Sequence, residues 1–148
     1  MEAILKKVIG AMLAIQRHPW EQGYCAQAMF DIGETETAVA MAHEAVLRQA
    51  EDGRLAMLYE DPVITDPAVN GEPVLRAYEI TRDAYYFEAA QRMLDYLLYK
   101  APKTDDGIMY AFNVSFYEGF SAKQIQADAC YMAPPFIAMI RAEASKNK

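Results

Sequence analysis

The sequence is poor in the residues that build metal and redox sites. Its 148 residues include two cysteines, Cys25 and Cys130, and two histidines, and neither cysteine has neighbours at metal-ligand spacing. We therefore expect reduced thiols, a cytoplasmic location, no metal site and no cofactor. Phosphate-binding loops and nucleophile elbows are also missing from the sequence, which argues against the enzyme classes built on those motifs.

Positive charge and long apolar runs are scarce as well. Fourteen Lys and Arg residues stand against 21 Asp and Glu residues, for a net charge of −7, and no basic cluster precedes the tail at 141–148. This balance argues against a nucleic-acid partner, although a local field in a pocket still allows an anionic small substrate. Residues 1–16 carry lysines inside an apolar stretch, so they resemble neither a signal peptide nor a membrane span.

The sequence also lacks the alternating polar and apolar runs of half-buried strands, and helical periodicity dominates it. With 53% hydrophobic residues the composition is that of a globular protein, and we predict a single all-α domain over residues 1–148. Segments 22–32 and 128–145 are apolar nearly all round, which is typical of helices enclosed on every side. Even-numbered helices are predicted inside and odd-numbered ones outside, with bounds near 2–16, 22–32, 36–50, 70–81, 84–99 and 128–145.

An internal repeat supports this alternation of inner and outer helices. A shift by 48 positions places Gly23 on Gly71, and two N-cap residues, Thr35 and Asp83, coincide just before the outer helices. Each unit then consists of an inner helix, a short turn, an outer helix and a longer loop. The longer loops precede inner helices, so loops and inner-helix N-termini gather at one end, where binding residues commonly lie.

The sequence resembles the unsaturated uronyl hydrolases of glycoside hydrolase families 88 and 105 in four segments, WEQG, TDPAVNGEPVLRAYEITRDAYYFEAAQRMLDYLL, DGIMYAFN and ADACYMAPPFIA. The resemblance implies three helical hairpins that form half of an (α/α)6 barrel. It also implies a substrate, an oligosaccharide that carries a 4,5-unsaturated uronic acid. In this reaction an aspartic acid protonates the vinyl ether double bond, water adds to the neighbouring carbon, and the resulting hemiketal falls apart.

By motif match, the resemblance places Asp128 at the catalytic acid/base and Asp66 at an assisting acid. Apolar neighbours would disfavour the charged form of the Asp128 carboxyl, whereas a helix N-terminus would favour it. The expected walls around this carboxyl are Tyr131, Met132 and Phe136. The alternatives are that Asp128 caps the sixth helix and that Asp66 belongs to an ordinary turn. The residues expected to contact substrate are Trp20, Glu21, Asn70 and Tyr131, with a structural role equally open for the tryptophan.

Two positions depart from the family pattern and weaken the functional transfer. Ala111 stands where histidine is usual, and Gln126 stands where tryptophan is usual. Both family residues would contact sugar, and three hairpins supply half of the helices that a closed barrel needs. The rival interpretation is therefore a truncated, non-catalytic helical domain that binds carbohydrate or protein.

An arc of three hairpins leaves apolar inner-helix surface uncovered, and soluble monomers rarely expose large apolar patches. Twofold symmetric assembly is the commonest way to cover such a surface. We therefore expect a homodimer, with collapse into a compact six-helix monomer as the competing outcome. The residues expected at the dimer interface are Tyr24, Met29, Tyr131 and Phe136.

Overall fold

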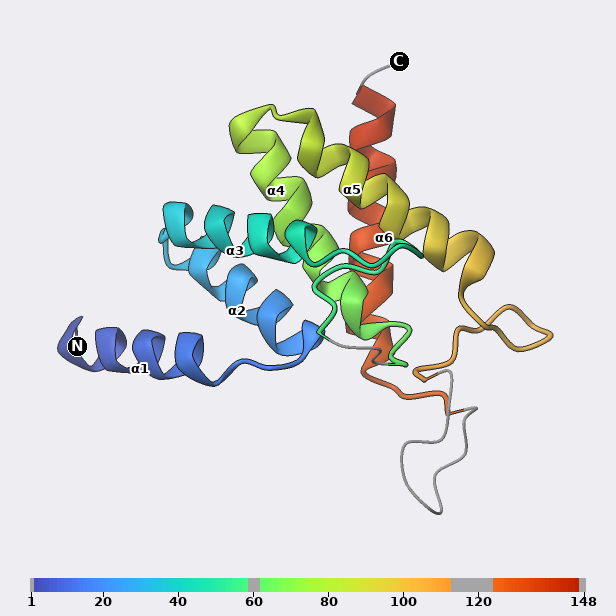
Figure 1. The fold of residues 1–148 in the computed structure, drawn as a ribbon, viewed down its shortest axis with the longest axis horizontal. Coiled ribbons are helices and arrows are strands. Elements are labelled where there is room, and N and C mark those ends of the chain that lie inside the picture. The colour runs from blue at the N-terminus through green and yellow to red at the C-terminus, as the bar shows by residue number, and fades with distance from the viewer. Residues whose placement is uncertain (1, 59–61, 113–123, 147–148) are drawn as a thin grey trace.

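The computed structural model describes residues 2–58, 62–112 and 124–146, and this part of the chain is helical (Figure 1). It contains six α-helices and no strand, with two isolated β-bridges, Val63 to Phe112 and Lys103 to Met109. The all-α prediction is confirmed. The helices are α1 (Glu2–Ile15), α2 (Pro19–Asp31), α3 (Thr35–Leu47), α4 (Gly71–Thr81), α5 (Ala84–Asp95) and α6 (Ala129–Lys146), with the 3-10 turn η1 (Asp66–Asn70) and the π-helical turn η2 (Tyr96–Lys100).

Two of the predicted hairpins are closed by short turns with left-handed backbone. Gly33 has a φ of 83° between α2 and α3, where glycine carries no steric penalty. Between α4 and α5, Arg82 has a φ of 58°, and the Asp83 side chain accepts a hydrogen bond from the Tyr85 amide at 3.0 Å. The outer helices end 95 − 47 = 48 residues apart, at Leu47 and Asp95, as the repeat predicts.

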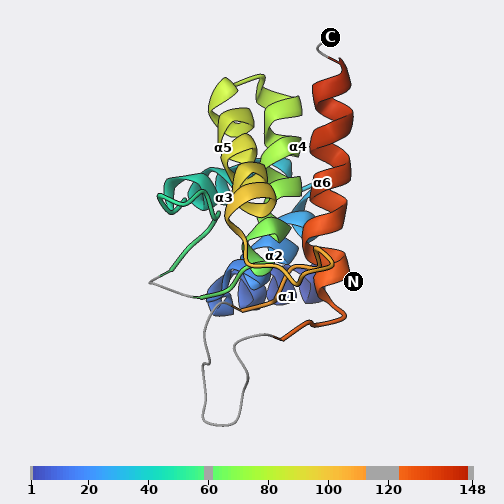
Figure 2. The ribbon, with the colours of Figure 1, turned by 90° about the vertical axis from the view of Figure 1, so that its right-hand side faces the viewer.

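Inner helix α4 lies between α2 and α6 and packs against both (Figures 1 and 2). Glycines at equivalent positions of the repeat make this close approach possible. A Cβ atom on Gly23 would lie 2.6 Å from Val69, and one on Gly71 would lie 2.2 Å from the Phe136 ring. Both positions therefore require glycine because a neighbouring inner segment occupies the space of the side chain.

The predicted burial of the inner helices holds for two hairpins and is wrong for α6. Seven of the 13 residues of α2 are buried, against five of 13 in α3, and five of the 11 residues of α4, against four of 12 in α5. In α6 only five of 18 are buried. Helix α6 packs on α4 and η1 along one face and lies at the edge of the molecule, so no described element covers its other face (Figure 2).

Two residues expected at a dimer interface lie inside the chain's own core. Met29 is 0% exposed in the cluster that α2 forms with α3, and Phe136 is 1% exposed against α4. That part of the interface prediction is therefore wrong, because these side chains are the ones that join the helices of a single chain. Tyr24 and Tyr131 remain exposed.

Helix α1 is the most loosely attached element. None of its described residues is buried, and it contacts the α2–α3 cluster through Ile9, Met12 and Leu13. Neither α1 nor any other helix in the described ranges is long and apolar enough to cross a membrane.

Candidate functional site

The starts of the inner helices meet at one end of the fold. The Asn70 amide donates a hydrogen bond to the Pro19 carbonyl at 2.8 Å, which joins the start of α2 to the start of α4. Thr65, just before η1, donates to the Met132 sulfur at 3.8 Å, which joins this segment to the first turns of α6. Trp20, Asp66 and the start of α6 therefore lie at the same end of the fold.

Both candidate acids lie near the Tyr24 hydroxyl on α2. Burial raises the pKa of Tyr24, and the negative charges of Asp128 and Asp66, with Tyr131, raise it further. The phenol therefore stays protonated at neutral pH and keeps its hydrogen-bond donor. Sequence analysis placed Tyr24 on a dimer surface and missed this position. Tyr24 follows Trp20 by four residues, which puts both rings on one face of a helix. This spacing is the sequence signal that could have revealed the position of Tyr24.

The Asp128 side chain does not cap α6 in this structure. Its backbone carbonyl accepts a hydrogen bond from the Tyr131 amide at 2.8 Å, but its carboxyl accepts none from the described residues. The expected apolar walls are not formed either. Asp128 is exposed, Tyr131 is 73% exposed, and Met132 and Phe136 point into the core instead. The carboxyl is therefore open to an incoming ligand.

Prolines leave two acceptors near this carboxyl without their usual helical partners. Pro134 and Pro135 lie inside α6 and have no N–H, so the carbonyls of Cys130 and Tyr131 lack the amide four residues ahead. Both prolines are exposed, so water or a polar ligand can approach the helix there. The start of α6 thus offers acceptors for hydroxyl groups as well as a carboxyl.

Trp20 and Tyr24 line an apolar pocket of about 290 Å³ between α1 and α2. Their side chains are 39% and 37% exposed, so each ring has one accessible part. Flat, partly exposed aromatic side chains provide large contact areas for ligands. Trp20 is thus accessible at the end of the fold where Asp66 and Asp128 lie.

Ala111, the first of the two positions that depart from the family pattern, lies beside the candidate site. Ala111 is 1% exposed, its carbonyl accepts from the Ile64 amide at 2.8 Å, and its amide donates to the Gln124 carbonyl at 2.8 Å. It is therefore held against the segment that leads into Asp66. The second departure, Gln126, is half-buried, and its amide donates to the Gln124 side chain at 3.4 Å.

The sequence model of glycosyl hydrolase family 88 matches residues 5–148 of the chain. The chain belongs to glycosyl hydrolase family 88. The match covers part of the family's domain, which agrees with an all-helical fragment of a barrel of that type. No curated protein and no solved structure matches the chain.

Asn70 has a positioning role in this family 88 chain. Its side chain is 1% exposed, and its amide donates to the Pro19 and Pro67 carbonyls at 2.8 and 3.5 Å. This burial argues against the expected contact of Asn70 with substrate. Asp66 is also buried, at 7% exposure. Within the described ranges, no group of three or more His, Cys, Asp or Glu side chains could hold a metal ion.

Glu21, expected to contact substrate, closes the N-terminus of α2 instead. Its carboxylate accepts hydrogen bonds from the His18 amide, at 2.9 Å, and from the Arg17 amide. Burial alone would raise the pKa of Glu21, but the backbone hydrogen bonds from His18 and Arg17 outweigh it and lower the pKa below its usual value. Glu21 therefore holds the helix start that presents Trp20.

The lowered pKa of Glu21 predicts a pH-dependent contribution to stability. An acid with a depressed pKa in the folded state stabilises the fold above its unfolded-state pKa, and this contribution is lost as pH falls through its folded-state pKa. We expect Glu21→Gln to destabilise the protein by about 0.5 kcal/mol at pH 7 and low salt. Urea unfolding at pH 7 and pH 3 measures this, with Glu51→Gln, an exposed acid, as control. An equal cost of Glu21→Gln at both pH values contradicts the assignment.

Proposed function

We propose that this family 88 chain removes 4,5-unsaturated uronic acid from the end of lyase-generated oligosaccharides. Asp128 donates a proton to the vinyl ether double bond, and water adds to the neighbouring carbon as Asp128 takes a proton back. The resulting hemiketal opens and releases the remaining sugar chain, without a glycosyl-enzyme intermediate. Asp66 is the assisting acid, and Trp20 and Tyr131 contact the sugar.

The observation that carries this proposal is that two carboxyl groups of different exposure lie at the end of the fold where the inner helices begin. Asp66 is buried and Asp128 is exposed, and the negative charges of both add to burial in raising the pKa of Tyr24. Two acids in such different surroundings suit two different roles. The exposed one has access to substrate, and membership of a hydrolase family supports assigning it the proton transfer.

Reaction in the presence of methanol tests the proposed chemistry directly. In vinyl ether hydration, methanol competes with water at the carbon next to the protonated one, so the trapped product is a methyl ketal that has lost the double bond and still carries the remaining sugar chain. Ordinary glycoside hydrolysis breaks the bond at the anomeric carbon, so the trapped product is a methyl glycoside that keeps the double bond. We expect the methyl ketal, which mass spectrometry identifies by the mass of the intact substrate plus methanol. A methyl glycoside that keeps the double bond contradicts vinyl ether hydration.

The rival function, a non-catalytic carbohydrate-binding domain, is favoured by the openness of Asp128. An acid without apolar walls lacks the environment that tunes most catalytic carboxyl groups, and Ala111 offers no polar group beside Asp66. This function predicts that unsaturated oligosaccharides bind and are recovered unchanged. Titration calorimetry followed by chromatography of the recovered sugar separates the two functions.

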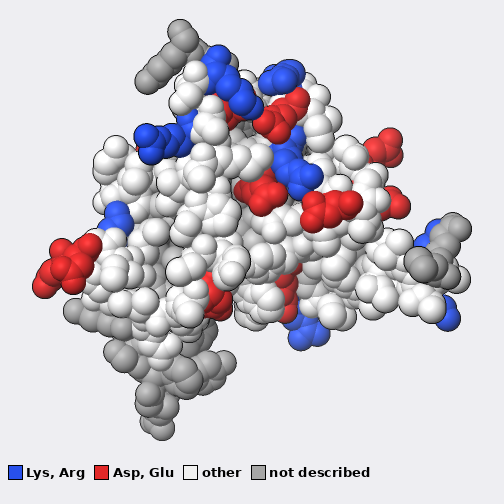
Figure 3. Space-filling view, turned by 180° about the vertical axis from the view of Figure 1, so that it is seen from behind, with Lys and Arg blue, Asp and Glu red and all other residues white. Residues whose placement is uncertain are grey.

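We propose further that the uncovered face of α6 pairs with a second copy of the chain. Exposed residues in this segment include Ile125, Tyr131, Pro134, Pro135 and Ala138, and the surface along α6 carries little charge over much of its length (Figure 3). Contiguous apolar surface of this kind is usually covered in a soluble protein. A second copy buries it by twofold symmetry.

Sedimentation equilibrium tests the dimer. We expect a particle of about 2 × 16.7 kDa at micromolar concentration. Ala138→Glu places a charge on the uncovered face and is expected to give a monomer, because burying an unpaired carboxylate is costly. Ala144→Glu, also exposed but near the far end of α6, is the control and keeps the dimer. A stable monomer of the unaltered chain contradicts this proposal.

A further inference from the structure

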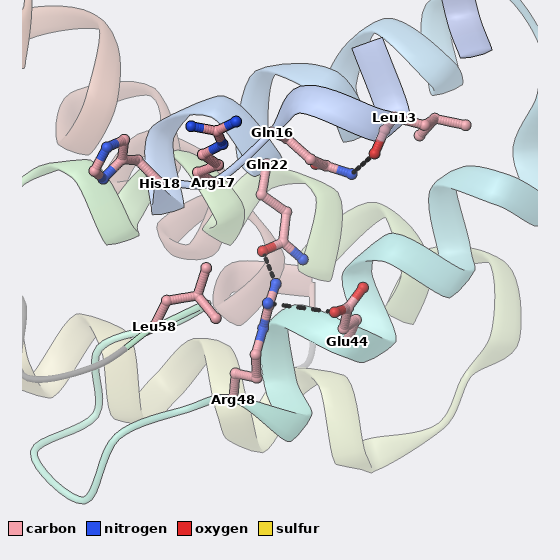
Figure 4. A pocket seen from close by; sticks show the side chains of 8 residues that line it. All are labelled: Leu13, Gln16, Arg17, His18, Gln22, Glu44, Arg48 and Leu58. Atoms are coloured by element: carbon pink, nitrogen blue, oxygen red, sulfur yellow. Dashed lines mark hydrogen bonds and ion pairs between the residues drawn. The ribbon is translucent and has the colours of Figure 1, made fainter. Parts of the chain in front are cut away.

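A second cavity, lined mainly by polar side chains, lies between the α1–α2 connection and the end of α3. It has a volume of about 210 Å³ and is lined by residues that include Gln16, Arg17, Gln22, Glu44 and Arg48 (Figure 4). Arg48 extends from α3 toward Gln22 of α2, while Arg17 lies across the pocket above Leu58 in this view. None of the acids and aromatic residues of the candidate active site lines this cavity.

Arg48 is incompletely paired in this cavity. One terminal nitrogen lies 3.3 Å from the Glu44 carboxylate, and the other donates to the Gln22 side-chain oxygen. The remaining donor, Nε, is buried and has no hydrogen-bond partner among the described residues. A donor that is shielded from water and left unpaired destabilises the fold, so it points to a partner that the chain itself does not supply.

The side-chain oxygen of Gln16 is a second buried polar atom in this cavity without a hydrogen-bond partner among the described residues. Gln16 donates through its amide nitrogen to the Leu13 carbonyl at 3.4 Å, but its side-chain oxygen is buried without a partner in the described part of the chain. The cavity therefore presents an unpaired donor and an unpaired acceptor. A ligand that combines acceptor oxygens with a hydroxyl donor satisfies both.

The charge of the cavity favours an anion. Among the described residues that line it are two arginines, Arg17 and Arg48, and one carboxylate, Glu44, in a chain whose net charge is −7. The Arg17 guanidinium is exposed, and its charge helps to lower the pKa of the nearby Glu21 carboxylate without an ion pair to a described side chain, so its donors are available to an incoming oxyanion. Guanidinium groups bind carboxylates through paired N–H donors in a fixed geometry.

We propose that this cavity binds a small hydroxylated carboxylate of the sugar-acid type. The carboxylate accepts hydrogen bonds from Arg17 and Arg48, and a hydroxyl donates to the Gln16 side-chain oxygen. The volume lies below the range of about 300 Å³ and upward that is typical of drug-sized ligands, which limits the occupant to about one sugar unit. The choice of a sugar acid rests on the proposed function, whereas the preference for a carboxylate rests on the cavity alone.

Titration calorimetry with D-glucuronate as the probe tests this site without requiring turnover. We expect binding by the unaltered chain and a loss of affinity of about tenfold or more in Arg17→Gln, because a charged hydrogen bond is removed. Arg17 is exposed, so this variant is expected to keep its thermal midpoint. Arg48→Lys keeps the charge but removes the forked donors and is expected to bind more weakly as well. Arg141→Gln, an exposed arginine on α6, is the matched control.

Three results would overturn the proposal. Equal binding of uncharged D-glucose shows that the carboxylate is not recognised, and equal binding of acetate shows that the hydroxyl is not recognised. Loss of glucuronate binding in Trp20→Ala but not in Arg17→Gln places the ligand in the candidate active site instead. Since the titration measures binding alone, its outcome is independent of whether the chain hydrolyses unsaturated substrates.

Discussion

Asp128→Asn is expected to lower the rate at which the chain consumes the ultraviolet absorbance of a 4,5-unsaturated uronyl disaccharide by about 10²–10⁴-fold. This range is the usual contribution of a positioned general acid or base. Asparagine has nearly the same shape but has no proton to donate to a carbon–carbon double bond. Because Asp128 is exposed and its carboxyl makes no hydrogen bond with the described residues, the substitution is expected to leave the fold unchanged.

Asp95→Asn is the matched control for this experiment. Asp95 is an exposed aspartate on outer helix α5, so removing its charge changes the net charge by the same amount while leaving the site intact. We expect this variant to keep the activity of the unaltered chain. Activity that survives Asp128→Asn shows that the proton comes from another group, with Asp66 as the next residue to substitute.

Gly71→Ala is expected to cause a large loss of stability for the addition of a single methyl group. The new Cβ would lie 2.2 Å from the Phe136 ring, which is itself 1% exposed in the main core, so the ring or the helix has to move. Overpacking of this kind costs about 1–3 kcal/mol, or more, and outweighs the gain in helix propensity of up to about 1 kcal/mol. We expect a net loss of about 2 kcal/mol, or a fall in Tm of about 4–8 °C for a chain of this size.

Gly10→Ala is the same kind of substitution but is not expected to lower the stability of the protein. Gly10 lies inside α1, and a Cβ there meets nothing within 4 Å, so we expect stability to stay the same or to rise by up to about 1 kcal/mol. Phe136→Leu added to Gly71→Ala is expected to recover part of the loss, since the two positions are in contact and their effects are not additive. A Gly71→Ala protein as stable as the unaltered chain contradicts the packing described here.

Much of the fold was predictable because it depends on local pattern. Helical periodicity predicted the six segments that form α1 to α6. The repeat predicted that Gly23 and Gly71 occupy equivalent positions. The burial of α6 was predicted wrongly, since an apolar sequence shows what a helix can bury but not whether another element lies against it. Phe136 was placed at an interface for the same reason, although α4 of the same chain already covers it.

The candidate site was predictable where the residues carry a motif and was missed where the role depends on distant contacts. Asp66 and Asp128 were named from the sequence, and both lie near Tyr24. The role of Asn70 depends on the Pro19 carbonyl, 51 residues away in sequence, so no local signal reveals it. Glu21 was assigned to substrate, although its position three residues after His18 is the spacing of a capping box.

The measurement that tests the central claim most directly is the loss of ultraviolet absorbance when the purified chain is mixed with unsaturated disaccharides. Substrates derived from pectin, glycosaminoglycans and ulvan cover the main classes of uronic acid linkage. The account predicts that absorbance falls with at least one of them, because hydration removes the conjugated double bond, and that it stays constant with Asp128→Asn. Constant absorbance with every substrate would contradict the proposed activity and support a non-catalytic carbohydrate-binding domain.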